Sequence, residues 1–158
     1  MTISSYGLSL VLAVIACVIG GVLGGLTLAR PGSVLGLTAL EVDAEEPPAD
    51  LPPTGAQTRA LAEGRALGGL LILSHATAAL FLGYQSSVGA AMAFALAMAW
   101  LGAAGGRAVS ALVDKTDKAA NRFNLGSLVF ELLIAATLSL PFFNAGRLVV
   151  LRGHGMLV

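Results

Sequence analysis

Three long stretches of the chain carry almost no charge. Met1 to Ala29 and Ala66 to Gly106 contain no Asp, Glu, Lys or Arg, and Phe123 to Gly146 contains only Glu131. A helix that crosses a bilayer needs about 20 apolar residues. Each stretch is long enough for one crossing, and the second is long enough for two. The sequence therefore predicts an all-α, polytopic integral membrane protein.

Composition supports this class and argues against several others. Only 11% of residues are charged, against about 25% in a soluble domain. Nine basic residues balance nine acidic ones, so no basic excess points to a nucleic-acid partner. No glycine-rich phosphate loop occurs, so no nucleotide partner is predicted. Cys17 is the only cysteine, which excludes an internal disulfide and a cysteine metal cluster. No metal site is predicted, and the expected surroundings are the lipid bilayer.

The apolar pattern divides the chain into a four-transmembrane-helix bundle within one membrane domain, residues 1–158. The expected helices cover approximately residues 6–29, 66–83, 88–106 and 124–144. The long connection between the first two helices holds an acidic, proline-rich segment, residues 41–53, which opposes helix and strand. We expect it to be a solvated loop, with a loop that docks another protein as the alternative.

Basic residues near the helix ends predict the orientation in the membrane. Seven of them flank the connections between helices one and two and between helices three and four: Arg30, Arg59, Arg65, Arg107, Lys115, Lys118 and Arg122. Only Arg147 and Arg152 belong to the opposite side. Because basic residues stay in the cytoplasm, both connections are expected there. Both termini are then expected to be periplasmic in a bacterial inner (cytoplasmic) membrane.

Small residues in the first helix predict close helix packing. Gly20, Gly21, Gly24 and Gly25 form two overlapping pairs four residues apart, a spacing that lets two helix backbones approach closely in lipid. Packing within the protein's own bundle is the favoured interpretation, and a dimer seam is the alternative.

Several short motifs together resemble a known family. They are Pro31 with Val34–Ala39, Arg65–Leu70, Gly106–Ser110 with Asp114, and Glu131–Leu132. The pattern resembles a family of small four-helix bacterial inner-membrane proteins known only as a domain of unknown function. The resemblance extends over approximately residues 10–145. It implies a four-helix inner-membrane protein and supplies no catalytic residues.

Glu131 lies at membrane depth, roughly 10 Å along the fourth helix from its start. A carboxylate there costs about 2.5–3.5 kcal/mol on insertion scales, so it should be protonated or paired. Arg65 and Arg107 are the candidate partners, and Asp114 shares the Arg107 face seven residues on. Such a charge cluster would either fix helix register or serve as an anionic head-group site or a general acid/base.

His75 lies near the middle of the second predicted helix. An interhelical hydrogen bond is the favoured role for its side chain. The alternatives are proton transfer with Glu131 and axial ligation of a haem or chlorin; no cofactor is otherwise predicted. Trp100, well inside the third helix, is expected in the core, with the wall of a ligand cavity as the alternative.

Two classes of function are consistent with these features. The favoured one is a non-catalytic accessory or binding subunit that packs against other membrane protein subunits through its Gly/Ala-rich helix faces. The alternative is a small intramembrane enzyme, isomerase-like, using Glu131 and His75 as acid and base on a lipid or isoprenoid. A proton-coupled transporter is disfavoured, because the chain has no inverted repeat and no broken helix pair.

Overall fold

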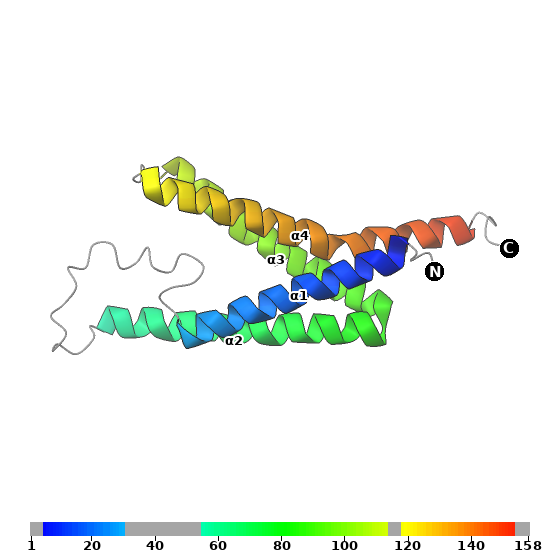
Figure 1. Cartoon of the computed structure of the whole chain (residues 1–158), viewed down its shortest axis with the longest axis horizontal. Helices are drawn as coiled ribbons and strands as arrows, with labels where there is room; N and C mark the ends of the chain where they lie inside the picture. Colours follow the sequence, from blue (N-terminus) through cyan, green and yellow to red (C-terminus); the bar gives the residue numbers. More distant parts are fainter. Residues whose placement is uncertain (1–4, 31–54, 114–117, 154–158) are drawn as a thin grey trace. The chain divides into compact units, whose positions relative to one another are not determined.

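The computed structural model describes residues 5–30, 55–113 and 118–153, and its regular elements in this part are all helices. In chain order they are α1 (Ser5–Ala29), α2 (Gly55–Tyr84), α3 (Ser86–Val113) and α4 (Lys118–Gly153) (Figure 1). Each contains a segment long and apolar enough to cross a membrane. The predicted all-α membrane protein with four spanning helices is therefore confirmed.

Three helices are longer than their apolar parts. α2 begins at Gly55 where the sequence predicted a start near residue 66, α3 continues to Val113, and α4 runs from Lys118 to Gly153. Hydropathy marks where a helix crosses lipid, whereas polar residues such as Gln, Glu and Arg also favour helix. The pattern therefore predicts the spans better than the helix ends. The acidic segment 41–53 lies outside the described residues.

α4 continues through Pro141, close to where the sequence predicted its end. Proline has no N–H to donate within a helix, and its ring crowds the preceding turn, so it kinks a helix unless neighbours accommodate it. The ribbon of α4 changes direction in its orange part (Figure 1). Pro141 is fully buried. Neighbouring groups therefore enclose the proline ring within the continuous helix.

The chain divides into two compact units, and the division crosses α1 and α2. The first unit comprises residues 1–19 and 75–158, and the second comprises residues 20–74. The first contains the start of α1, the end of α2 and all of α3 and α4, and the second contains the end of α1 and the start of α2.

In the first unit, α3 packs along α4. The buried positions of α3 recur every three or four residues and are mostly alanine: Ala90, Ala93, Ala97, Trp100 and Ala104. Those of α4 have a similar helical spacing, with Ala135 directly beside Ile134: Glu131, Ile134, Ala135, Leu138 and Pro141. Such a spacing places each set on one helix face. Alanine on the α3 face lets the two backbones approach closely, which favours association in lipid.

A very tight turn joins α2 to α3. Gln85 is the one residue between the two helices. Its N–H donates to the carbonyl of Phe81 at 2.8 Å, and its own carbonyl accepts from Gly89 N–H at 2.9 Å. A Cβ on Gly89 would collide with the backbone of Leu82. The turn therefore requires glycine at this position.

In the second unit, Gly24 of α1 faces Gly68 of α2. A Cβ on Gly24 would lie 2.8 Å from the Gly68 carbonyl oxygen, and one on Gly68 would lie 2.6 Å from the Leu28 nitrogen. Gly20 is also buried, whereas a Cβ on Gly21 or Gly25 would meet nothing within 4 Å. Gly24 thus packs within the chain, as the favoured interpretation predicted.

Candidate functional site

His75 and Trp100 form a hydrogen bond inside the first unit. The indole Nε1 of Trp100 on α3 donates to Nε2 of His75 on α2, at 3.1 Å. Both residues are buried, and their rings meet edge to face with centroids 6.0 Å apart. A neutral imidazole that accepts at Nε2 carries its proton on Nδ1. His75 therefore has the interhelical hydrogen bond that the sequence analysis favoured, and Trp100 lies in the core.

Trp100 also connects α3 to α4. Its ring meets Phe130 edge to face, with centroids 6.1 Å apart. Phe130 directly precedes Glu131, whose partner Arg107 lies seven residues beyond Trp100 on α3. Residues seven apart share a helix face, and the rise between them is about 10 Å. One face of α3 thus presents both an aromatic contact and an ionic contact.

Arg107 and Glu131 form the ionic contact. Arg107 Nε donates to Glu131 Oε1 at 2.7 Å, a distance typical of a charge-assisted hydrogen bond. The Arg107 side chain is 17% exposed and that of Glu131 is 2% exposed. Glu131 is thus paired with one of its two predicted partners. The attraction between the two charges offsets part of the cost of burying the carboxylate.

The second oxygen of Glu131 has a different environment. Oε2 is buried, and it accepts no hydrogen bond within the part of the chain that the structure describes. An ionised carboxylate can accept about four hydrogen bonds through its two oxygens. Buried acceptors without a donor are rare in folded proteins and call for an explanation. The ion pair therefore leaves acceptor capacity at membrane depth.

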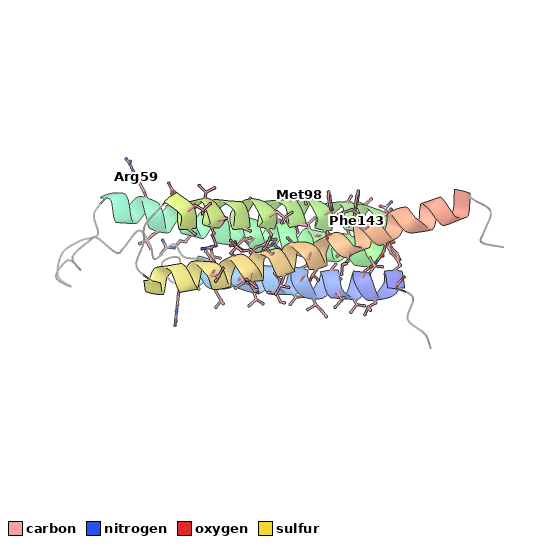
Figure 2. The ribbon with its side chains drawn as sticks, turned by 90° about the horizontal axis from the view of Figure 1, so that it is seen from above. Arg59, Met98 and Phe143 are labelled. Atoms are coloured by element: carbon pink, nitrogen blue, oxygen red, sulfur yellow. The ribbon has the colours of Figure 1, made fainter. Side chains whose placement is uncertain are left out.

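Two further residues belong to the predicted charge cluster, Arg65 and Asp114. Arg65 is exposed on α2 and belongs to the second unit, whereas Arg107 and Glu131 belong to the first. Asp114 falls outside the described residues. Arg59, another predicted cytoplasmic cation, points away from the ribbon of α2 (Figure 2). Within the first unit, the structure forms the Arg107–Glu131 pair of that cluster.

The geometry at His75 does not favour axial ligation through Nε2. A metal bound at Nε2 would need the lone pair that accepts the Trp100 N–H. A haem or chlorin at this nitrogen would require the His75–Trp100 hydrogen bond to break.

A group of aromatic residues lies near the other end of the α3–α4 pair. Phe94 of α3 stacks on Phe142 with ring centroids 4.5 Å apart, and Phe143 meets Phe94 edge to face at 5.8 Å. Figure 2 labels Phe143 on α4. Phe142 and Phe143 directly follow Pro141 on α4. Both remain partly exposed. They are suited to pack against lipid as well as against α3.

Sequence reasoning missed several of these contacts. Trp100 was expected in the core without a named partner, and Phe130 was not considered. The spacing of seven between Trp100 and Arg107 was the available signal, since it places both on one face of α3. For Gly68 the signal was Gly64, four residues earlier, a second small-residue pair that could match the one in α1.

Comparison with family models, with curated proteins and with solved structures found no match to this chain. The resemblance to small four-helix inner-membrane proteins therefore stays a prediction.

Proposed function

We propose that this protein is a non-catalytic accessory subunit of a larger membrane assembly. The proposal rests on the contacts that its polar side chains form at membrane depth. His75 accepts from Trp100, and Glu131 is paired with Arg107. The two residues that an acid/base mechanism would need are both engaged in contacts between helices, where they stabilise one arrangement of α2, α3 and α4.

The exposed surface of α1 is suited to pack against another membrane protein. On α1, large apolar side chains exposed at helical spacing form a stripe: Val11, Ile15, Val18 and Val22. Gly21 and Gly25 on the same helix leave its backbone accessible. Small residues beside branched apolar ones allow a neighbouring helix to come close, and in lipid this contact supplies much of the association energy.

Native mass spectrometry of the protein extracted gently from its own membranes tests the accessory role. The proposal expects recovery in a stoichiometric complex with at least one other membrane protein. Ile15→Trp, a bulky change on the exposed stripe, should reduce that recovery, whereas Leu73→Trp on the exposed face of α2 serves as the matched control. Recovery of the wild type without any protein partner would contradict the role.

We also propose a bacterial inner membrane as its location, with both termini periplasmic. The support is the distribution of basic residues, seven against two, between the two sides. Cys17 is the only cysteine and is buried, so single cysteines can be added to a Cys17→Ala background. A membrane-impermeant maleimide applied to intact cells should label a cysteine at position 158 and spare one at position 115. The reverse labelling pattern would show that the C-terminus is cytoplasmic and would contradict the proposed topology.

A further inference from the structure

The Arg107–Glu131 pair has one oxygen that is not satisfied within the described chain. Arg107 Nε donates to Oε1, and Oε2 is buried without a donor. A buried ionised oxygen with no hydrogen bond is costly, because it has lost water and gained nothing in return. The site would therefore be stabilised by a group that brings an N–H or O–H donor to Oε2.

The net charge of the Arg107–Glu131 pair limits which chemical groups can bind there. Arg107 and Glu131 together are electrically neutral, so a bound anion alone would leave one net negative charge at membrane depth, and a bound cation alone one net positive charge. Both are expensive there. A zwitterion keeps the site neutral, because its anionic part can face the guanidinium while its cationic part faces the carboxylate.

The depth of the pair fits a membrane lipid. The spans end at Leu112 on α3 and begin at Leu125 on α4. Arg107 and Glu131 are therefore about 8 and about 9 Å inside the apolar region at 1.5 Å per residue. Arginine at this depth extends toward the interface and draws head groups and water inward. With 17% of its side chain exposed, Arg107 is the member through which the pair meets its surroundings.

We propose that Arg107 and Glu131 bind the head group of a zwitterionic phospholipid with a primary amine, of the phosphatidylethanolamine type. The guanidinium of Arg107 donates to phosphate oxygens. The ammonium of the lipid donates to Oε2 of Glu131 after the carboxylate turns toward the Arg107 side. The inference goes beyond the accessory role, since it concerns what the isolated protein binds.

The amine provides a sharp chemical distinction. An ethanolamine head group carries three N–H donors, and each N-methylation removes one until choline has none. The phosphate, the net charge and the acyl chains stay the same through this series. If Oε2 selects the lipid through a hydrogen bond, affinity must fall as N–H groups are replaced, whereas a purely electrostatic site would change little.

Native mass spectrometry of the full chain, delipidated and then offered one lipid at a time, tests the proposal. The lipids are phosphatidylethanolamine, its mono- and dimethyl derivatives, phosphatidylcholine and, as the anionic comparison, phosphatidylglycerol, all with the same acyl chains. We expect retention to fall along the N-methylation series by about tenfold overall, the effect of one charge-assisted hydrogen bond. The wild type alone provides this result, so it does not depend on any variant folding.

Variants then test which residues are responsible for the preference for the ethanolamine lipid. Glu131→Gln should abolish the difference between ethanolamine and choline lipids, and Arg107→Gln should lower the retention of both. Glu63→Gln is the matched control, because Glu63 is an exposed carboxylate at the start of the apolar span Leu61–Tyr84 of α2. It should leave the difference unchanged.

Three results would overturn the proposal: equal retention of the ethanolamine and choline lipids by the wild type, tighter retention of phosphatidylglycerol than of either, and a loss of the difference in Glu63→Gln equal to that in Glu131→Gln. The measurement uses the isolated protein. Failure here would therefore be distinguishable from failure to find the protein in a larger assembly.

Discussion

Trp100 donates its indole N–H to Nε2 of His75 across 3.1 Å, and this single bond joins α2 to α3 in the interior of the first unit. It accounts for two polar groups that would otherwise be costly in a membrane. The same face of α3 carries Arg107 seven residues later, where the second polar contact, to Glu131 of α4, is made. α3 thus takes part in both of these polar contacts at membrane depth.

His75→Ala should destabilise the protein. It would leave the buried indole N–H of Trp100 without this acceptor, and an unsatisfied buried group costs about 1–3 kcal/mol. Loss of the imidazole also opens a small void. The free energy of unfolding, measured by SDS titration followed by circular dichroism, should fall by an amount in that range.

Ser74→Ala is the matched control for this change. Ser74 precedes His75 on α2, and its hydroxyl donates to the Leu71 carbonyl of the same helix at 3.3 Å. Its replacement should change the free energy of unfolding by less than about 0.5 kcal/mol. If both variants were equally stable, the hydrogen bond between Trp100 and His75 would contribute nothing measurable.

Breaking the Arg107–Glu131 pair from one side should cost more than removing both partners. Arg107→Gln or Glu131→Gln alone leaves an uncompensated charge, which typically costs about 3–5 kcal/mol when buried. The double variant leaves two neutral amides and should be less destabilised than the two single changes added together. A double-mutant cycle on the free energy of unfolding measures this coupling. Strict additivity of the two changes would mean that the ion pair carries no coupling energy.

The helices could be predicted from the sequence because hydropathy acts locally. Charge-free stretches identify the membrane spans wherever they occur, and Glu131 stood out because it is the one charge in its stretch. Arg65 and Arg107 could be predicted as its candidate partners, since both were assigned to its side of the membrane and a buried carboxylate requires a partner. The choice between them could not.

The contacts that depend on helix rotation could not be predicted in the same way. Whether His75 faces Trp100, and whether Gly24 rather than Gly25 faces α2, depends on a rotation of about 100° per residue about the helix axis. The distribution of apolar residues around these helices does not specify that rotation, because lipid-facing and core-facing residues are both apolar. The continuation of α4 through Pro141 likewise depends on burial of the ring.

Gly24→Ala should disrupt the packing of α1 on α2. The added methyl would lie 2.8 Å from the Cβ of Leu71 and 2.9 Å from the nitrogen of Ile72, so backbone must move. Overpacking of this kind costs about 1–3 kcal/mol. Gly25→Ala is the control, because a Cβ there meets nothing within 4 Å. An equal loss of stability in both variants, measured by SDS titration, would indicate that this contact is absent.

Two glycines at the α2–α3 turn should respond to alanine in opposite directions. A Cβ on Gly89 collides with the backbone of Leu82 and Phe81, so Gly89→Ala must open the turn or shift α3. Gly83 is exposed near the end of α2 with nothing within 4 Å of an added Cβ. There, alanine raises helix propensity at no steric cost.

We expect Gly83→Ala to raise the free energy of unfolding by up to about 1 kcal/mol. Gly89→Ala should lower it by about 1–3 kcal/mol, because the methyl contacts backbone rather than a flexible side chain. The effect should reach the site, since moving α3 at its first turn also shifts Trp100 relative to His75. Tryptophan fluorescence reports this directly, because Trp100 is the only tryptophan. Its emission should change in Gly89→Ala and not in Gly83→Ala, and unchanged emission in both would show that the turn does not position α3.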